Sequence, residues 1–464
     1  MPKVNPSPGG KDLGWGIRLK RMCGGEKFRK HTVTFEFTTN YDLRNLRMIA
    51  QVFLKKGRDE SVRRFHPWIF SGAVASVKGY EPAEGDLVDV FASDGEFLGC
   101  GHWQVGSISV RLLSFTDREL PADFWTSRLG ACLSVRRALA LRSTDCYRLV
   151  HGEGDGLPGL IIDYYAGTCV LQAHSVGMFL ARPAIVSALR EIYGGELVAV
   201  YDKSSGTAPF KAGLDLCDGY LYRAEGNETP EQVGGDVLRS TTSLHVMPGP
   251  DRASIVQENG HKFYVDWETG QKTGFFLDQR ENRALVERYS SGRRVLNLFC
   301  YTGGFSVYAL AGGAASVDSV DSSARAIELV DKNIELNGFS SRHHSYCEDA
   351  IDFVKAAPHC KYDLMIVDPP AFAKHRGALH NALRAYQRLN AAAISAVAPG
   401  GIIFTFSCSQ VVDRQQFALA VFSAAASVGR RVRIMDRLNQ PADHPVNIYH
   451  PEGEYLKGLM LYVE

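Results

Sequence analysis

The stretch "GGIIFTFSCSQ", residues 400–410, places a cysteine directly after an apolar run. Residues 402–406 are mostly β-branched or aromatic, a composition typical of a buried strand. Cys408 follows between two serines, at the point where such a strand ends. A thiol that only fills space would more naturally lie inside the run, because free cysteine usually behaves as a small buried hydrophobe. The position of Cys408 therefore favours a nucleophile at the mouth of a cleft.

A second reactive group follows another apolar run, in "MIVDPPAF", residues 365–372. Asp368 comes first after the run, and Pro369 and Pro370 cannot continue a central strand. The prolines should hold this loop rigid, with the Asp368 carboxylate facing the cleft. Ligands of doubly wound sheets bind beyond the carboxyl ends of the strands. Asp368 and Cys408 are therefore expected to overhang one cleft from neighbouring strands.

Three further strand ends carry groups suited to a nucleoside. In "NLFCYTGGFSV", residues 297–307, Gly303 and Gly304 allow a tight turn and a close approach of the backbone to a ligand. Asp321 ends the next strand, where a carboxylate can accept hydrogen bonds from both hydroxyls of a ribose. Asp349 ends the third and can accept a hydrogen bond from the amino group of adenine. The loop is not G-x-G-x-x-G, so the glycines alone do not identify a dinucleotide site.

Strands and helices alternate regularly in the part of the chain that carries these groups. Strands are predicted at 295–299, 316–320, 345–347, 364–367 and 402–406. Helices are predicted from about 305 and at 322–336, 350–357, 383–398 and 414–427. This alternation predicts βαβ units in a parallel, doubly wound sheet, which two late strands at about 431–435 and 456–463 complete in antiparallel orientation.

The chain before residue 246 has a different pattern of apolar and polar residues. Short strand-like runs at 87–91, 97–99 and 108–113 predict a small β-rich domain, and a mixture of helices and strands follows it. The predicted domains are a poorly structured extension (1–47), the β-rich domain (48–122), a central α/β domain (123–245) and the doubly wound domain (246–464).

Composition narrows the class of protein. The 464 residues are 45% hydrophobic and 22% charged, as in ordinary globular proteins. No apolar run reaches the ~18–20 residues of a membrane span, and no apolar segment of a secretory signal follows Met1. The ten cysteines include no Cys-x-x-Cys pair, which argues against a structural zinc site and a disulfide scaffold. We therefore expect a cytoplasmic protein without a metal.

Charge is distributed unevenly along the chain. Residues 1–70 hold fifteen Lys and Arg against six Asp and Glu, although the whole chain has a net charge of only +1. A basic end of this kind favours a polyanion partner such as nucleic acid. A solvated tail beside a basic helix explains the charge equally well.

Several long motifs together resemble one family. They are "RRFHPWIFSGAV" (63–74), "GEGDGLPGLIIDYY" (152–165), "ENGHKFYVDWETGQKTGFFLDQRENR" (258–283), "DPPAFAK" (368–374), "FSCS" (406–409) and "DHPVNIYHPEGEYLKG" (443–458). The chain from about Met48 resembles the class I, S-adenosylmethionine (SAM)-dependent cytosine-5 methyltransferases of large-subunit ribosomal RNA that carry a PUA domain. Residues 1–47 match nothing in the family, so Met48 is an alternative start and a truncation there is expected to stay functional.

The resemblance implies a role for each matching position. Cys408 and Asp368 are the catalytic residues, and Phe372 and Lys374 face the target base. The implied SAM contacts are Phe276, Asp278, Gln279, Asn297, Tyr301, Thr302, Gly303, Asp321, Asp349 and Ala350. The implied fold is a Rossmann-like methyltransferase domain after a PUA-like RNA-binding domain and a central domain. The implied partner is large-subunit rRNA, naked or in an early assembly intermediate, and the oligomeric state stays open between a monomer and a homodimer.

Methylation of cytosine at C5 explains why a thiol is needed. C5 becomes nucleophilic enough only after a thiolate adds to C6, and loss of the C5 proton later expels the thiol. Asp368 can hydrogen-bond the base and stabilise the charge that develops on addition. The base must be unpaired or turned out of a helix, and Phe372 is placed to stack on it. Cys300 is a rival thiol, but its place beside the SAM loop favours a structural role.

Two other functions compete with this one. Asp-Pro-Pro followed by an aromatic residue also serves methylation of a base nitrogen, which needs no thiol. Ala371, inserted before Phe372, and the presence of Cys408 argue against that reaction. An RNA-binding protein that retains the cofactor fold without activity is the other alternative, and the intact set of Gly303, Asp321, Asp368 and Cys408 argues against it.

Overall fold

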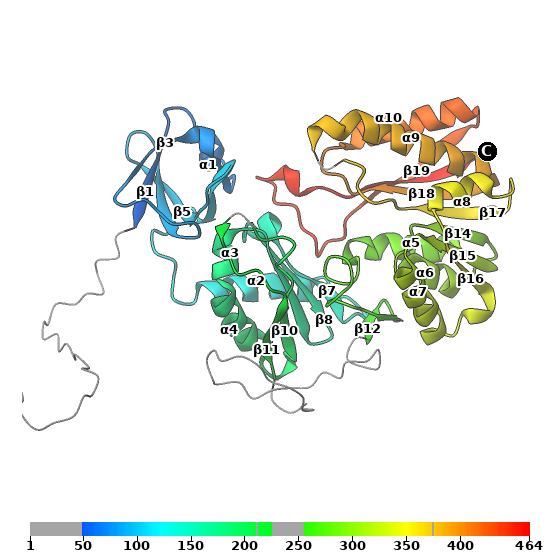
Figure 1. The fold of residues 1–464 in the computed structure, drawn as a ribbon, viewed down its shortest axis with the longest axis horizontal. Helices are drawn as coiled ribbons and strands as arrows, with labels where there is room; N and C mark the ends of the chain where they lie inside the picture. The colour runs from blue at the N-terminus through cyan, green and yellow to red at the C-terminus, as the bar shows by residue number, and fades with distance from the viewer. Residues whose placement is uncertain (1–48, 210–211, 225–254, 374) are drawn as a thin grey trace, which may run out of the picture. The chain divides into compact units, whose positions relative to one another are not determined.

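The described residues build a succession of sheets along the chain. The computed structural model describes residues 49–209, 212–224, 255–373 and 375–464 (Figure 1). The predicted extension over 1–47 and the predicted contact of Lys374 with the base lie outside the described residues. No helix within the described ranges is long and apolar enough to cross a membrane.

The first sheet has six strands in the order β2-β6-β5-β4-β1-β3. Its elements are β1 (Ala50–Leu54), α1 (Glu60–Arg63), β2 (Trp68–Phe70), β3 (Val74–Lys78), β4 (Leu87–Phe91), β5 (Phe97–Trp103) and β6 (Ile108–Ser114). The three strands predicted here are confirmed, and β5 and β6 are longer than predicted. Buried Val52, Val90 and Leu112 belong to the core of this sheet.

The second sheet has five strands in the order β11-β10-β9-β8-β7. Its elements are α2 (Phe124–Ala138), β7 (Cys146–His151), β8 (Leu160–Tyr165), β9 (Thr168–Ala173), α3 (Val176–Leu180), α4 (Arg182–Tyr193), β10 (Ala199–Asp202) and β11 (Gly219–Arg223). Leu133 of α2 and Leu189 of α4 share one core with Ile162 of β8, so these helices cover this sheet.

A hairpin of β12 (Ile255–Glu258) and β13 (His261–Tyr264) leads into the last part of the chain. Asn259 and Gly260 turn it with φ of 49° and 89°, as the two-residue turns of hairpins require. The turn places Glu258 in the interior, where its two carboxylate oxygens accept hydrogen bonds of 2.8 and 2.7 Å from Arg283. The hairpin is thereby attached to the helix that follows it.

The last sheet has seven strands in the order β16-β15-β14-β17-β18-β20-β19. The strands are β14 (Arg294–Leu298), β15 (Ser316–Asp321), β16 (His343–Cys347), β17 (Tyr362–Val367), β18 (Val397–Ser407), β19 (Val432–Asn439) and β20 (Lys457–Val463). The helices are α5 (Arg280–Tyr289), α6 (Gly304–Ala311), α7 (Ala324–Leu336), α8 (Ala350–Ala356), α9 (Leu379–Ala396) and α10 (Arg414–Val428). The first five strands pair in parallel, and β20 and β19 complete the sheet antiparallel. The predicted doubly wound sheet is confirmed.

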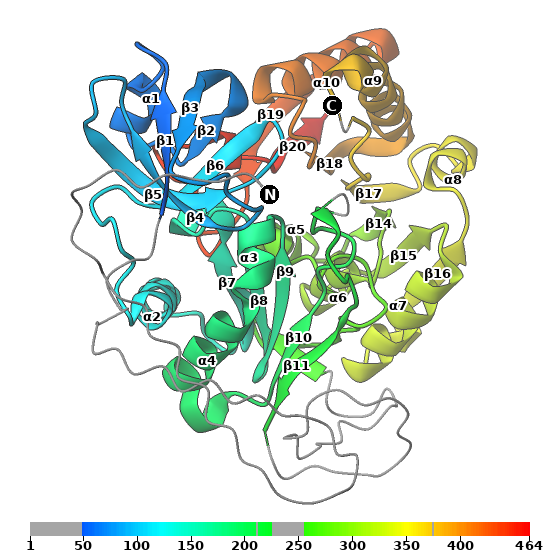
Figure 2. The same cartoon turned by 60° about the vertical axis from the view of Figure 1, so that its left-hand side comes forward.

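Both faces of this sheet are covered because successive side chains of a strand point to opposite sides. Phe404 and Phe406 of β18 belong to one core with helices α5, α6 and α7, and Ile403 between them belongs to another with α8, α9 and α10. Figures 1 and 2 both show α9 and α10 side by side and apart from α6 and α7. One predicted boundary is wrong: the helix predicted through 398 ends at Ala396, because Val397 is buried and pairs with Tyr362 as the first residue of β18.

Candidate active site

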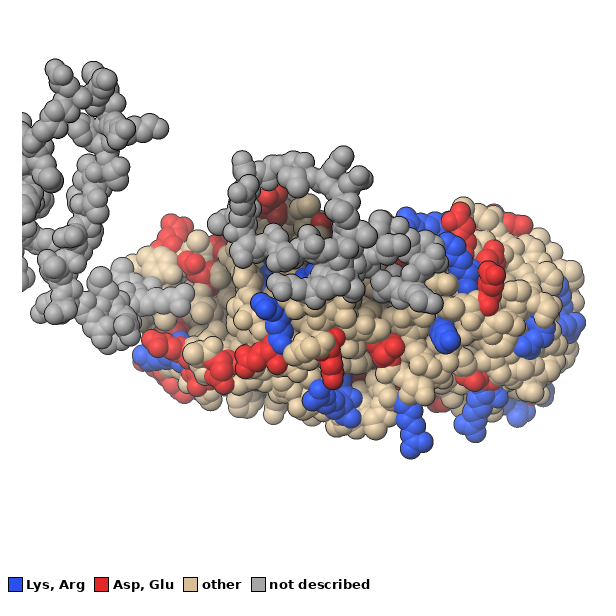
Figure 3. Space-filling view, turned by 90° about the horizontal axis from the view of Figure 1, so that it is seen from below, with Lys and Arg blue, Asp and Glu red and all other residues tan. Residues whose placement is uncertain are grey.

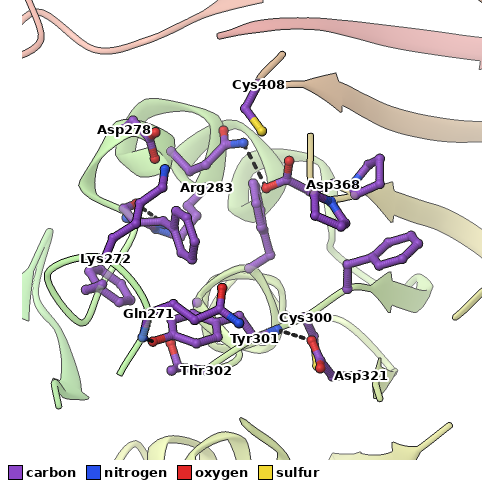
Figure 4. A pocket seen from close by; sticks show the side chains of 18 of the residues that line it. Gln271, Lys272, Asp278, Arg283, Cys300, Tyr301, Thr302, Asp321, Asp368 and Cys408 are labelled. Carbon is purple, nitrogen blue, oxygen red and sulfur yellow. Dashed lines mark hydrogen bonds between the residues drawn. The ribbon is translucent and has the colours of Figure 1, made fainter. Parts of the chain in front are cut away.

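A cavity opens at the carboxyl ends of β14, β15, β17 and β18 (Figure 4). Its wall also includes the segment before α5, which the chain brings from outside the sheet. The lining residues are Gln271, Lys272, Phe275, Phe276, Asp278, Gln279, Arg283, Phe299, Cys300, Tyr301, Thr302, Gly304, Phe305, Asp321, Ser322, Asp368, Pro369, Pro370, Cys408 and Leu456. Eight of the residues named from the sequence therefore meet here: Phe276, Asp278, Gln279, Tyr301, Thr302, Asp321, Asp368 and Cys408.

The loop after β14 reaches the cavity through an unusual backbone. Phe299, Tyr301 and Gly303 have φ of 58°, 48° and 77°, and the first two are not glycine. Such conformations cost energy outside glycine and concentrate at functional sites. The Tyr301 amide donates a hydrogen bond of 3.0 Å to Asp321 Oδ2, shown in Figure 4. The Ser323 amide donates one of 2.9 Å to Asp321 Oδ1, so two backbone groups fix this carboxylate at the cavity wall.

Asp278 stands at another wall of the cavity and has unmet bonding capacity. Its Oδ2 accepts a hydrogen bond of 2.6 Å from the Tyr455 hydroxyl. Its Oδ1 is buried and has no hydrogen-bond partner among the described residues. Burial alone would raise the pKa of Asp278, but the positive charges of Lys272 and His444 and the Tyr455 hydrogen bond hold it below its usual range. A carboxylate in this state suits a ligand that brings a cation or an N–H donor.

The chemistry of these two carboxylates is compatible with SAM. Asp321 could accept hydrogen bonds from ribose hydroxyls, and Asp278 Oδ1 could accept one from the ammonium of the methionine part. Gly304 also lines the cavity, and a Cβ atom there would lie 3.2 Å from Arg283 Cδ and 3.5 Å from Phe275 Cε2. The residues present are therefore suited to this cofactor, which supplies an electrophilic methyl group when bound.

Asp368 and Cys408 follow neighbouring parallel strands. Val367 of β17 pairs with Thr405 of β18, so the two strands end side by side. In Figure 4 the Cys408 sulfur points toward the Asp368 carboxyl group. Burial and the nearby charge of Asp278 raise the pKa of Asp368 to about 7, although Gln279 donates a hydrogen bond of 2.9 Å to it. Burial and the charge of Asp368 raise the pKa of the Cys408 thiol to about 11. Between these two values the pair holds one proton.

Cys300 lines the same cavity, so proximity to the cavity does not by itself distinguish the two thiols. Cys300 is 6% exposed and belongs to the core of the sheet. Burial and the charge of Asp321 raise the pKa of Cys300 well above its usual value. The largest effect of a charge on Cys300 comes from Asp321, whereas the largest on Cys408 comes from Asp368.

Four of the other residues named as SAM contacts do not line the cavity. Asn297 is buried and donates a hydrogen bond of 2.8 Å to Ser306 Oγ. Gly303 caps the start of α6. Asp349 caps α8 by accepting hydrogen bonds from the Ile351 and Asp352 amides, and Ala350, the first residue of that helix, is buried in the core.

Phe372, named for the base, is also absent from the cavity lining. Its ring lies 4.8 Å from that of Tyr386, and Tyr386 accepts a hydrogen bond of 2.9 Å from Ser407 Oγ. Phe372 therefore packs beside the end of β18, next to the strand end that carries Cys408.

Sequence reasoning missed two cations in the cavity wall, Lys272 and Arg283. Lys272 has φ of 49°, and its Nζ lies 4.6 Å from the centre of the Phe276 ring. Its charge lowers the pKa of Asp278 and opposes the rise in pKa of Asp368 and Cys408. The sequence signal that could have identified Lys272 is its position between Gly270 and Gly274. Around both glycines the backbone packs too closely to admit a side chain.

Comparison with known proteins identifies the family to which this chain is similar. Residues 242–458 match the family model of S-adenosylmethionine-dependent methyltransferases, and residues 52–115 match that of PUA-like domains. The chain is 39% identical over 424 residues to ribosomal RNA large subunit methyltransferase I of Shewanella amazonensis, covering 90% of this chain and 100% of the relative. It is 39% identical over 417 residues to the protein of that name from Erwinia tasmaniensis, covering 89% of this chain and 98% of the relative.

Solved structures share the fold. One, a methyltransferase-type chain in complex with SAH, has a TM-score of 0.72 and 24% identity and covers 89% of this chain and 100% of its own. Another, from Streptococcus mutans and described as SAM-dependent, has a TM-score of 0.70 and 23% identity with the same coverage. The predicted family, fold and cofactor are confirmed. The identity along the full length of its relatives shows that this chain belongs to the family of ribosomal RNA large subunit methyltransferase I, with a PUA-like domain ahead of a SAM-dependent methyltransferase domain.

Proposed function

We propose that this enzyme forms 5-methylcytosine in large-subunit ribosomal RNA, with Cys408 as the nucleophile and Asp368 as its proton partner. The observation that carries the proposal is the placement of both groups at the ends of β18 and β17, in one cavity with Asp321. A methyltransferase that acts on a base nitrogen has no use for a thiol at this position.

The chemistry follows from the proton that Asp368 and Cys408 share. As Cys408 approaches the base, its S–H bond breaks and the proton passes to the Asp368 carboxylate. The Sγ–C6 bond then forms, the electrons of the C5–C6 double bond shift into the ring, and Asp368 delivers the proton to N3. With its pKa at about 7, Asp368 can accept and release a proton near neutral pH.

The enamine-like C5 of this adduct takes the methyl group. The C5 proton then leaves to solvent, its electron pair restores the C5–C6 double bond, and the Sγ–C6 bond breaks with its electrons on Sγ. Asp368 takes the proton back from N3 and returns it to Sγ, which regenerates the thiol and the neutral base. Because the reacting edge of cytosine is not accessible in a helix, the base must enter the cavity unpaired. Phe372, held against Tyr386 beside β18, is the aromatic surface nearest in sequence to Asp368 on which it can stack.

The RNA partner is supported by the family and by the basic N-terminal region. Ten of the fifteen Lys and Arg in residues 1–70 lie in residues 1–47, outside the described residues. Figure 3 shows side chains of both charges on the face drawn there. Within the described part of the first sheet, Lys56 and Arg58 are exposed cations. We assign the first sheet to RNA binding and the enzyme to the cytoplasm, where ribosomal RNA is made in bacteria.

One experiment tests both the base atom and the nucleophile. Purified enzyme with SAM and a large-subunit rRNA transcript is expected to yield 5-methylcytosine on nucleoside mass spectrometry. A transcript that carries 5-fluorocytosine should form a covalent complex, because fluorine at C5 cannot leave as a proton. Peptide mapping should place the adduct on Cys408.

The matched variants are Cys408→Ala and Cys300→Ala. Only the first should lose both the product and the adduct while SAM affinity stays near that of the wild type. A methylated nitrogen in the product, an adduct on Cys300, or an active Cys408→Ala enzyme would contradict the proposal.

A further inference from the structure

A buried lysine lies beside the turn that carries Cys408. Lys457 is the first residue of β20 and is 5% exposed. It pairs across the sheet with Ser407, the residue immediately before Cys408. Its Nζ donates hydrogen bonds of 2.6 Å to the Ser409 carbonyl and 2.7 Å to the Val412 carbonyl. The side chain therefore joins both ends of the segment that follows Cys408.

Holding a turn with a buried lysine has a high cost in free energy. Lysine is rarely buried without a charged partner, because removing an ammonium from water is costly. Among the described residues Lys457 makes no salt bridge, and its hydrogen bonds go to two neutral carbonyls. These bonds use two of its three N–H donors. A neutral donor could make the same two bonds at a lower desolvation cost. We therefore expect the charge of Lys457 to have a further function.

The charged groups around Lys457 and Cys408 indicate that purpose. Burial lowers the pKa of Lys457 to about 8, and the negative charge of an ionised Cys408 opposes this fall, as do Glu454 and Asp413. Arg414 acts in the opposite direction.

The groups around the thiol itself mostly oppose its ionisation. On Cys408, Asp368 and Asp278 disfavour the thiolate and Lys272 favours it. At neutral pH Lys457 is mainly an ammonium, and it reaches the turn from β20, the strand that pairs with β18.

We propose that Lys457 is the positioning residue of the nucleophile: it holds the turn so that Cys408 Sγ faces Asp368, and its ammonium charge stabilises the thiolate. When the S–H bond breaks and the proton passes to Asp368, the electron pair stays on Sγ beside a fixed positive charge. This inference rests on Cys408 being the nucleophile proposed above. It explains how a thiol with a raised pKa becomes reactive without a histidine beside it.

The test measures thiolate formation directly, without RNA. The rate of alkylation of Cys408 by iodoacetamide is followed against pH on the full chain, with the site verified by peptide mass spectrometry. Lys457→Met removes the charge and the hydrogen bonds, Lys457→Gln keeps an N–H donor without charge, and Lys457→Arg keeps the charge. Lys355→Met, at an exposed lysine of α8, is the control.

Lys457→Met and Lys457→Gln should slow alkylation of Cys408 about tenfold at pH 7, where Lys457 carries its charge. The difference from the wild type should fade above about pH 8, where Lys457 loses its proton. Lys457→Arg should retain most of the wild-type rate, and all variants should bind SAM as the wild type does. A purely structural lysine would not separate the Gln and Arg variants in this way. If Lys457→Met does not fold, the comparison of Gln with Arg decides.

Equal alkylation rates at pH 7 in the wild type, Lys457→Gln and Lys457→Arg would overturn the inference. This result is distinct from failure of the proposed function. A wild-type enzyme that formed no 5-methylcytosine but showed the charge-dependent rate would remove the cytosine-5 assignment and leave the coupling of Lys457 to Cys408 intact.

Discussion

Gln279 Nε2 donates a hydrogen bond of 2.9 Å to Asp368 Oδ2 and so links the segment before α5 to the end of β17. The two residues lie 89 positions apart in the chain. This bond is the largest influence that lowers the pKa of Asp368, against burial and the charge of Asp278, which raise it. The proton chemistry of the cavity therefore depends on a residue outside the sheet.

Removing that bond should shift the pH dependence of catalysis. In the wild type, methyl transfer should increase as pH rises through about 7, because Asp368 must lose its proton before it can accept the one from Cys408. Gln279→Leu raises the pKa of Asp368 further, so this rise should move to higher pH. The measurement is the single-turnover rate against pH, with exposed Gln415→Leu on α10 as the control. An unchanged profile in Gln279→Leu would mean that another group sets it.

Asp368→Asn should abolish methyl transfer and increase the free energy of unfolding. The folded-state pKa of about 7 exceeds the value of about 3.9 of an unfolded chain. The ionised carboxylate therefore costs the folded state nothing below about pH 4 and its full penalty above about pH 7. At about 1.4 kcal/mol per pKa unit, the variant should gain up to about 4 kcal/mol in the free energy of unfolding at pH 8 and little at pH 4. Urea unfolding at both pH values, beside the loss of methyl transfer, checks this.

Asp321→Ala should weaken SAM binding. Its carboxylate is held by the Tyr301 and Ser323 amides and is placed to meet the ribose hydroxyls. Loss of these partners should cost about 1–3 kcal/mol of binding free energy in calorimetry. Asp352→Ala, at an exposed acid of α8, should bind as the wild type does. Unchanged affinity in Asp321→Ala would place the nucleoside elsewhere.

The buried pair of Asp443 and Arg280 should make the fold sensitive to acid. Two hydrogen bonds of 2.9 Å join the guanidinium to the carboxylate. Burial would raise the pKa of Asp443, but the charges and hydrogen bonds of His444 and Arg280 hold it far below its usual range. A depressed pKa gives stability that is present above about pH 4 and is lost as pH falls below that value.

Asp443→Asn should accordingly lower the free energy of unfolding at pH 7 by about 3–5 kcal/mol, because it leaves Arg280 buried without its charge partner. The loss should shrink as pH falls. Denaturant unfolding from pH 7 to pH 3 gives the measurement, and Asp352→Asn serves as the reference. A loss that does not depend on pH would contradict the role of the charge.

Exposed cations of the first sheet should contribute to RNA affinity through phosphates. Lys56→Gln with Arg58→Gln should weaken rRNA binding and make the slope of log K against log salt less steep by about 0.7–0.9 for each lost phosphate contact. Lys332→Gln, at an exposed position of α7, is the control. An unchanged salt slope would remove these two residues from the RNA surface.

The sequence determined the regular part of this protein. The apolar runs that became β14, β15, β17 and β18 alternate with helices, and the runs of β15, β17 and β18 are followed at once by Asp321, Asp368 and Ser407. That local pattern was enough to predict the doubly wound sheet, its antiparallel end and the placement of Asp368 and Cys408 at one edge. Side chains directly after parallel strands meet at that edge whatever the detailed packing, so strand order alone brought them together.

 

Only the tertiary structure decided which groups shift the pKa values of Asp368 and Cys408. Gln279 and Lys272 precede Asp368 by 89 and 96 positions, and Lys457 follows Cys408 by 49. No local pattern joins positions so far apart, because their contacts depend on how a loop before α5 and the strand β20 pack against the sheet. The raised pKa values of Asp368 and Cys408 have the same origin, since burial and neighbouring charge exist only once those distant segments have come together.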